Sequence, residues 1–368
     1  MDSKSKLHYL CLQKTNEGQA SYAHVHEIIA GLKRHGWKIR LFEPVYKKNC
    51  PGALARLGQF LLTQARLWFS QKPDVVYIRH HFASWPTALW ARLKKIPVVQ
   101  EVNGPYEDVF IAWPFTSHFK PFLKWLMRSQ LRWADIVITV TPQLASWVTR
   151  ESKNANVYVV PNAANIKLFT PQAAQKEVSM YLPETFVIFF GALTSWQGID
   201  TMLEAVRRPE WPQEVRLVIV GDGVERQKVE EAAAKGEVSY LGKVPYREIP
   251  PLVARSLAGL SPQSSPKNRS KTGLFPLKVF ETLACGVPVI VSDFPGMADL
   301  VRQGKCGIVI PPENPKALAE AVRFLYHHPE IRKQMGQKGR ELIKRQHSWD
   351  ARATQTHEIL LSLINKKG

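Results

Sequence analysis

The chain has 368 residues, a length that suits two domains of roughly 150 to 200 residues better than one or three. With 45% hydrophobic residues, 22% charged residues and eleven Trp, it has enough apolar surface for a core, which excludes a disordered chain. The formal net charge of +19 predicts an anionic partner: a nucleic acid, a phosphorylated ligand or an acidic membrane face.

The positive charge is concentrated in the first half of the chain. Residues 1–170 contain 23 Lys or Arg and 10 Asp or Glu. Residues 44–100 alone contain nine basic residues and a single acidic one, Asp74. We therefore expect the larger anionic surface to be recognised by the first half.

Targeting and cysteine patterns indicate a cytoplasmic protein. The first residues, MDSKSKLHYLCLQ, lack the apolar stretch and the cleavage site of a signal peptide. There is no run of 18 or more apolar residues, so we expect no membrane-spanning helix. The four cysteines lie far apart and form no CxxC pair, which predicts neither a zinc site nor a disulfide framework.

Five short, β-rich apolar runs in the first half predict parallel strands. They are residues 7–12, 38–42, 74–78, 97–101 and 136–140. Amphipathic stretches of crossover-helix length lie between them, including residues 20–35 and 53–70. The alternation of strand and helix predicts a doubly wound sheet.

The same pattern restarts in the second half, where further strands are expected. They are residues 186–193, 215–223, 238–244, 257–262, 287–293 and 306–312. Residues 200–207 and 224–235 read as helices between them, and the polar, Pro-containing residues 161–184 read as the connector. We therefore expect an α/β fold of two Rossmann-like domains facing a central cleft, where ligands bind in such folds.

Residues 265–298 are the most informative segment for chemistry. A basic, Gly-containing loop leads into Pro276, then a helix to Ala284, then a buried strand. Lys278 and Glu281 are three residues apart and share one face of this helix near its N-terminus. The site predicted there binds a diphosphate, with Lys278 neutralising it and Glu281 accepting from ribose hydroxyls. From the spacing alone, a solvent-exposed ion pair on a surface helix is equally consistent.

In this segment and in five others the chain resembles the B-type retaining glycosyltransferases, in particular glycosyltransferase family 4. The other segments occur in the order in which the family has them, and the resemblance covers nearly the whole chain. They are ADIVITVTPQL with VYVVPNAANIKLFTP, VIFFGALTSWQGIDTMLEAV, VRLVIVGDGVERQKVE, SYLGKVP and HSWDARATQTHEIL.

The resemblance implies a metal-independent, retaining transfer of a sugar from a UDP- or GDP-sugar, with no cofactor. It implies an acceptor-binding domain at residues 1–170, a donor-binding domain at residues 171–345, and a terminal helix at residues 346–368 that packs on the first domain. It also implies a set of donor-binding residues. They are Gly18, Gly191, Gln197, Val244, Arg269, Gly273, Leu274, Phe275, Lys278 and Glu281.

The chain departs from the family pattern at three positions. Gly273 stands where the family usually has the Glu that holds the donor sugar, and Ala192 and Gln197 stand where it has the Arg and Lys that bind the diphosphate. We expect Lys278, with Arg269 or Lys271, to supply the missing charge.

Two further residues are predicted to be catalytic. Asn103 matches the position of a family His at the reacting sugar, and Asn can hold a sugar hydroxyl but cannot act as a general base. Arg79 follows the third strand and is a candidate for binding the phosphate or an acidic acceptor. The adjacent His80 and His81 are expected to be solvent-exposed rather than catalytic.

Residues 110–132 combine a basic stripe with bulky apolar side chains. Lys120, Lys124, Arg128 and Arg132 recur every four residues, and Trp125 lies among them. Such a helix suits an anionic membrane surface and a lipid-linked or glycan acceptor, as in cell-surface polysaccharide or glycolipid synthesis. The alternative is a domain helix with its apolar face on the sheet and its charges solvated. No nucleic-acid-binding motif is present, so nucleic acid ranks low as a partner.

Two other functions stay open. The losses at Ala192, Gln197 and Gly273 are consistent with a catalytically weak scaffold subunit that binds nucleotide sugars. An epimerase or an inverting transferase would keep the same nucleotide pocket.

Overall fold

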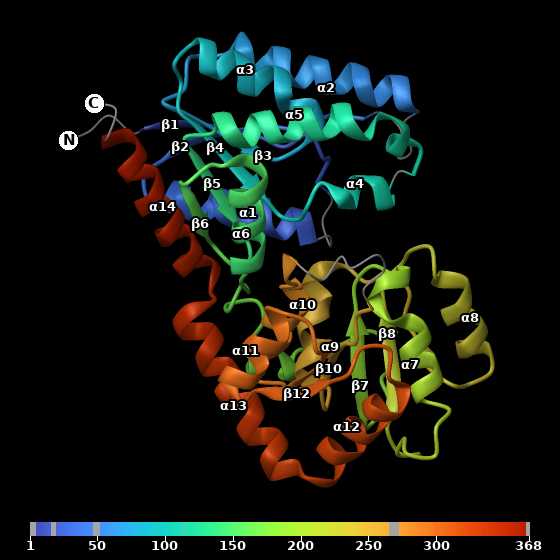
Figure 1. Cartoon of the computed structure of the whole chain (residues 1–368). Coiled ribbons are helices and arrows are strands. Elements are labelled where there is room, and N and C mark those ends of the chain that lie inside the picture. Colours follow the sequence, from blue (N-terminus) through green and yellow to red (C-terminus); the bar gives the residue numbers. More distant parts are fainter. Residues whose placement is uncertain (1–4, 16–19, 47–51, 113, 265–271, 366–368) are drawn as a thin grey trace. The chain divides into compact units, whose positions relative to one another are not determined.

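Figure 1 shows the computed structural model of the chain, which describes residues 5–15, 20–46, 52–112, 114–264 and 272–365. The chain forms two compact units. The first contains the N-terminal strand, residues 24–161 and residues from Arg352 onwards, and the second contains residues 162–351 together with residues 20–23. The second unit begins before residue 171 because Asn162 Nδ2 donates to Phe275 O at 2.7 Å and Ala164 N donates to His347 O at 3.0 Å.

The first unit is built on a six-stranded parallel sheet in the order β2-β1-β3-β4-β5-β6. The strands are β1 (Lys6–Leu10), β2 (Lys38–Phe42), β3 (Val75–Arg79), β4 (Val98–Val102), β5 (Ile136–Thr139) and β6 (Val157–Val159). The order of the chain reverses between β1 and β3, and such a switch point is where ligands bind in open α/β sheets.

Helices cover both faces of this sheet, with α2, α3 and α5 together on one face (Figure 1). They are α1 (Ala20–Arg34), α2 (Ala53–Trp68), η1 (Phe82–Ser84), α3 (Trp85–Leu93), α4 (Glu107–Ala112), η2 (Pro114–Phe119), α5 (Lys120–Trp133), α6 (Pro142–Ser152) and α14 (Trp349–Asn365). The predicted basic helix therefore begins at Lys120, because Pro121 occupies its first turn and residues 114–119 form a separate 3₁₀ turn.

The second unit has a six-stranded parallel sheet in the order β9-β8-β7-β10-β11-β12. The strands are β7 (Phe186–Phe190), β8 (Arg216–Val220), β9 (Ser239–Tyr240), β10 (Gly259–Ser261), β11 (Val289–Ser292) and β12 (Gly307–Ile310). Counted from β7, this is the Rossmann order 3-2-1-4-5-6, and its switch point lies between β7 and β10.

Alternate residues of β7 and β8 enter two separate cores, because successive side chains of a strand point to opposite faces. One core is shared with α9, α10, α11 and α13, and the other with α7, α8 and α12. The helices and 3₁₀ turns are η3 (Pro171–Gln175), η4 (Ser195–Gln197), α7 (Ile199–Ala205), α8 (Arg226–Ala234), η5 (Tyr246–Glu248), α9 (Ile249–Arg255), α10 (Leu277–Ala284), α11 (Met297–Gly304), α12 (Pro315–His327) and α13 (Pro329–Gln346).

The predicted fold class, two Rossmann-like domains with parallel sheets, is confirmed. Every run that was predicted as a strand overlaps one, and β6 completes the first sheet. Within the part of the chain that the structure describes, no helix is long and apolar enough to span a bilayer.

Candidate functional site

The loops that follow β7 and β8 approach each other at the carboxyl edge of the second sheet. Gly191 N donates to Val220 O at 3.0 Å, and Leu193 N donates to Asp222 O at 2.9 Å. A Cβ atom on Gly221 would lie 1.8 Å from the Gly191 carbonyl oxygen, so only glycine fits this contact. The two loops therefore form one surface of closely packed backbone at this edge of the sheet.

Helix α10 brings Lys278 and Glu281 together, as their spacing predicts. It begins after Pro276, because a proline ring clashes with a helical turn on its N-terminal side. All eight residues of the helix are buried. Lys278 is 8% exposed and Glu281 is 4% exposed. The pair is thus not the solvent-exposed ion pair that the spacing alone also allowed.

The amine of Lys278 is held beside the loop that follows β7. Its Nζ donates to Gln197 Oε1 at 2.8 Å and lies 3.7 Å from the centroid of the Phe189 ring. A Cβ atom on Gly191 would lie 3.2 Å from the same Nζ. Burial lowers the pKa of Lys278 to about 7, and the nearby Glu281 carboxylate acts in the opposite direction. A ligand anion would restore the charged form.

Glu281 is held by a tyrosine that the sequence did not single out. Tyr246 OH donates to Glu281 Oε1 at 2.5 Å. Tyr246 follows the turn that contains Val244, and the side chain of Val244 is buried in the core. Val244 itself can therefore offer a ligand only its backbone. Tyr246 directly follows the family-like segment SYLGKVP, and this position was the one feature of the sequence that could have indicated its role.

The three residues before Pro276 are held in place through their backbone. Gly273 has φ +77°, a left-handed conformation in which any side chain is strained, so its lack of a Glu side chain agrees with its backbone. Leu274 N donates to Pro295 O at 2.8 Å, and the Phe275 carbonyl accepts from Asn162. Ala192 is exposed and apolar, and supplies no charge.

Three predicted donor-site residues cannot be placed. Gly18, Arg269 and Lys271 lie outside the described residues. In the described part, Lys278 is the cation that stands beside Gly191 and Gln197.

In the first unit, the residues at the switch point converge on Glu101 in β4. The Tyr9 and Tyr77 hydroxyls each donate to Glu101 Oε2 at 2.9 Å, and His24 Nε2 lies 3.2 Å from the same oxygen. Arg79 Nη1 and Asn103 Nδ2 each donate to Glu101 Oε1 at 2.7 Å. Two predicted catalytic residues, Arg79 and Asn103, are therefore brought together by the Glu101 carboxylate.

The electrostatics of this cluster follow from burial and pairing. Glu101 is 1% exposed; burial alone would raise its pKa, but His24, Arg79 and the hydrogen bond from Asn103 hold it well below the usual range. Burial, and then the Glu101 charge, raise the pKa of Tyr9 and of Tyr77. Because Glu101 already neutralises Arg79, this guanidinium is a poorer phosphate ligand than the sequence indicated.

The two histidines after β3 are less exposed than expected. His80 Nδ1 lies 3.1 Å from Gln100 Oε1, and His81 Nδ1 accepts from Ala83 N at 3.2 Å. Both side chains are partly buried, and burial lowers the pKa of each to about 4. They are therefore neutral at physiological pH.

Two cations of the predicted basic stripe on α5 are paired. Lys124 Nζ lies 3.3 Å from Glu107 Oε1, and Arg128 Nε donates to Glu151 Oε2 at 2.7 Å. Lys120 lies over the Phe110 ring, and Arg132 is exposed. Trp125 is 53% exposed.

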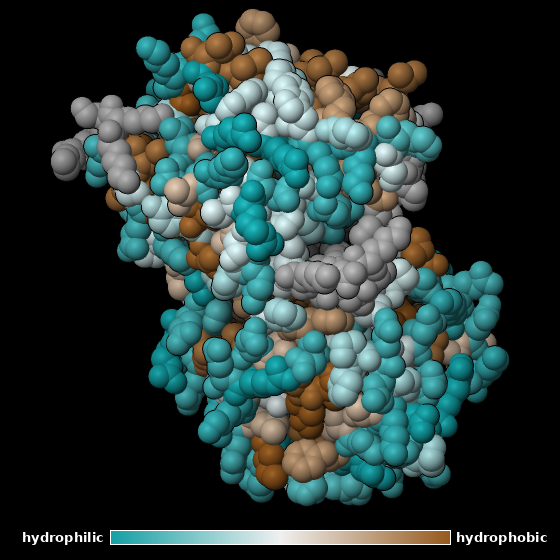
Figure 2. Space-filling view, viewed as in Figure 1, coloured by the Kyte–Doolittle hydropathy of each residue, from teal (hydrophilic) through white to brown (hydrophobic). Residues whose placement is uncertain are grey.

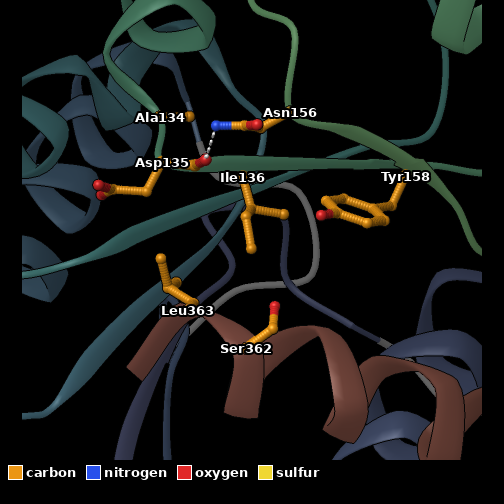
Figure 3. Close-up of a pocket in the computed structure, with 7 residues that line it drawn as sticks. All are labelled: Ala134, Asp135, Ile136, Asn156, Tyr158, Ser362 and Leu363. Atoms are coloured by element: carbon orange, nitrogen blue, oxygen red, sulfur yellow. Dashed lines mark hydrogen bonds between the residues drawn. The ribbon is translucent and has the colours of Figure 1, made fainter. Parts of the chain in front are cut away.

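A cavity of about 390 Å³ lies away from all these residues, between β5, β6 and α14 (Figure 3). It is lined by Ala134, Asp135, Ile136, Asn156, Tyr158, Ser362 and Leu363. Its polar groups serve the fold, since Asp135 Oδ2 accepts from Val98 N and Asn156 Nδ2 donates to Asp135 O (Figure 3). Among the described residues, no group of three or more His, Cys, Asp or Glu is placed to hold a metal ion.

Both units match models of known families. Residues 172–342 match the glycosyl transferases group 1, and residues 23–168 match Glycosyltransferase Family 4. An uncharacterized glycosyltransferase of Methanocaldococcus jannaschii is 24% identical over 220 residues, which cover 59% of this chain and 56% of that protein. The chain thus spans about half the length of that relative.

Solved structures share the fold. Sucrose-phosphate synthase from Thermosynechococcus elongatus aligns with a TM-score of 0.82 and 19% identity, over 99% of this chain and 100% of that chain. Anabaena HepE in complex with UDP-glucose aligns with a TM-score of 0.72 and 20% identity, over 97% and 99%. These likenesses define a protein with the B-type glycosyltransferase fold. The chain belongs to glycosyltransferase family 4, with a group 1 domain as its second unit.

Proposed function

We propose that the chain transfers a sugar from a nucleotide-diphosphate sugar, a UDP- or GDP-sugar, to a hydroxyl acceptor. The observation that carries the proposal is the buried pair Lys278 and Glu281 beside Gly191, at the switch point of a parallel sheet. The membership of family 4 supports it, as does the UDP-glucose bound by the structural neighbour HepE.

The proposed roles follow from the chemistry of each group. Lys278 Nζ neutralises the diphosphate as the C1–O bond to it breaks, and Gln197 orients the amine. Glu281, fixed by Tyr246, accepts from the ribose hydroxyls of the donor. We propose a retaining, metal-independent reaction: the acceptor hydroxyl forms its bond to C1 on the face the diphosphate leaves, and its proton passes to the departing phosphate oxygen. Asn103, anchored by Glu101, holds a sugar hydroxyl.

We also propose that the acceptor is a lipid-linked sugar or a glycan in cell-surface polysaccharide or glycolipid synthesis. The motivating observation is α5, where the basic residues Lys120 and Arg132 accompany the exposed Trp125. The protein would then act at the cytoplasmic face of a membrane, attached peripherally through anionic headgroups.

Release of nucleoside diphosphate from a panel of UDP- and GDP-sugars, with lipid-linked and glycan acceptors, tests the proposal. Lys278→Ala should lower kcat/KM at least tenfold, because it removes the charge that stabilises the leaving group. Lys228→Ala is the matched control: Lys228 is about half-exposed in α8 and pairs with Asp200, so kcat/KM should stay within about twofold. An unchanged value for Lys278→Ala would remove Lys278 from the site.

The second candidate function is a scaffold that binds a nucleotide sugar with little turnover. It is favoured by the absence of charge at Ala192, Gln197 and Gly273. Thermal shift with the same donor panel distinguishes it, since a bound donor stabilises the fold by mass action. Stabilisation without nucleotide release in the presence of acceptors would favour the scaffold, and interconversion of the donor sugar would favour an epimerase.

A further inference from the structure

Helix α2 exposes a row of leucines on the side that faces away from the sheet. Leu54, Leu57 and Leu61 recur at spacings of three and four residues and form one stripe, whereas Leu67 is buried. In the structure this stripe is exposed: Leu54 is 85% exposed, Leu57 53% and Leu61 53%. Phe69, which follows the helix, is 90% exposed. An amphipathic helix of a water-soluble layer normally turns this stripe to the core.

The opposite side of α2 is buried and mixed: Leu67 lies in the core with Phe60 and Trp68 against it, beside two polar residues. Thr63 and Gln64 are completely buried, and Gln64 Oε1 accepts from Thr87 N at 3.2 Å and from Thr87 Oγ1 at 2.8 Å. Trp68 Nε1 also donates to Thr87 Oγ1, at 3.1 Å. These bonds to α3 fix the rotation of α2 about its axis, so the outward leucine stripe is built into the fold.

The exposed stripe continues onto the neighbouring helices. Helix α3 contacts both α2 and α5, and Trp85 of α3 packs against Trp125 of α5 with ring centroids 5.7 Å apart. On α5, Phe122 is 58% exposed and stacks with Trp125. Figure 2 shows hydrophobic residues gathered over this layer at the top of the view. We call α2, α3 and α5 the three-helix layer.

The charge on the three-helix layer has one sign. Its sequences contain seven cations and no Asp or Glu. The cations are Arg56, Arg66, Arg92, Lys120, Lys124, Arg128 and Arg132. Lys124 and Arg128 are paired with Glu107 and Glu151, which lie outside the three helices, so the charge of the helices themselves remains basic. Leucines and aromatic rings among basic residues complement an anionic bilayer, which offers phosphates to the cations and acyl chains to the apolar side chains.

We propose that the three-helix layer lies on an anionic lipid bilayer and that α2 supplies the inserted apolar side chains, with Leu54, Leu57 and Leu61 entering the acyl region. This inference rests on the membrane attachment proposed above and moves its main apolar contact from α5 to α2. The alternative is that a second copy of the chain binds this face, so that the leucines of the two copies pack against each other.

Flotation of the full chain with vesicles tests the proposal, using phosphatidylcholine alone or with about 30 mol % phosphatidylglycerol, a charge density that attracts basic segments. The test variant is Leu57→Glu with Leu61→Glu. The matched control is Tyr181→Glu with Val224→Glu in the second unit, where the side chains are 89% and 82% exposed. All four positions are exposed, so both variants should fold with unchanged circular dichroism.

We expect the wild type and the control to float with anionic vesicles at low salt, and the Leu57→Glu, Leu61→Glu variant to bind at least tenfold more weakly. Equal binding by that variant would overturn the role of α2 while leaving membrane attachment intact. No binding by the wild type would remove the membrane attachment itself. A wild-type dimer in light scattering that the double variant abolishes, without a change in vesicle binding, would assign the face to a second copy. Nucleotide release, measured without vesicles, tests the transferase proposal separately.

Discussion

At the residue scale, Lys278 is the buried cation of the proposed donor site in the second unit. Its position on the same helix face as Glu281 could be predicted from a spacing of three residues, because helix geometry is local. Its contacts with Gln197 and the Phe189 ring could not, since they depend on how the loop after β7 folds against α10. For the same reason the bond from Tyr246 to Glu281 has no local signal.

The lowered pKa of Lys278 predicts a pH-dependent donor affinity. The amine is charged below its pKa of about 7 and neutral above it, whereas the diphosphate of a nucleotide sugar stays ionised throughout. Donor affinity should therefore fall as the pH rises, by about tenfold between pH 7 and 9. Calorimetric titration with a productive donor measures it. Lys278→Arg keeps its charge at every pH, so its profile should be flat, and a flat wild-type profile would contradict the prediction.

Glu101 is the corresponding residue of the first unit, and its loss should be costly. Glu101→Gln keeps the shape but leaves the Arg79 guanidinium buried without its counterion, which costs about 3–5 kcal/mol. The control is Glu107→Gln, because Glu107 is 43% exposed and its pair with Lys124 contributes less than about 1 kcal/mol. Urea unfolding compares the two variants.

The Glu101 carboxylate also makes the stability of the fold depend on pH, and the direction follows from its lowered pKa. Its pKa is lowered in the folded state, so its contribution to stability is complete above the unfolded pKa of about 4 and is lost as the pH falls below that value. The wild type should lose stability faster than Glu101→Gln on acidification from pH 5. If the stabilities of the wild type and of Glu101→Gln fell in parallel with pH, the contacts around Glu101 would not be stabilising its ionised form.

At the element scale, the strands were predictable and the orientation of the helices was not. Short β-rich runs between Gly- and Pro-containing turns mark strands directly from the sequence. The outward stripe of α2 depends on Gln64 meeting Thr87, two residues that are far apart in the chain. The leucine periodicity therefore predicts a helix, whereas only the tertiary bonds determine which side is buried.

The close contact between the loops after β7 and β8 likewise restricts which residues fit at the ends of these strands. Gly221→Ala places a Cβ atom 1.8 Å from the Gly191 carbonyl oxygen, against backbone that cannot yield cheaply, so we expect a loss above about 3 kcal/mol. Gly236→Ala is the control: Gly236 also has a positive φ, but a Cβ atom there meets nothing within 4 Å, so the cost is about 1 kcal/mol. Chemical denaturation gives both values, and equal losses would refute the close-contact explanation.

At the scale of the whole molecule, the last helix, α14, packs on the first unit and completes it. Trp37 Nε1 donates to His357 Nδ1 at 2.9 Å, and the rings of His35 and His357 stack with centroids 4.6 Å apart. Gln355 Nε2 donates to Val159 O at 2.9 Å, and Ala353 packs against Gly31. Residues from Arg352 onwards thus belong to a unit whose other residues precede 162.

This topology predicts that the two units differ in their ability to fold alone. A fragment of residues 1–161 lacks the completely buried Ala353 and Leu360, and exposes the apolar surface that they cover. It should be unfolded or aggregated, with no cooperative transition on heating, whereas residues 162–351 are continuous and should melt cooperatively. Adding a peptide of residues 345–368 should restore a transition to the first fragment, because it supplies the side chains that close that unit. A cooperative melt of residues 1–161 without the peptide would show that α14 is dispensable for this fold.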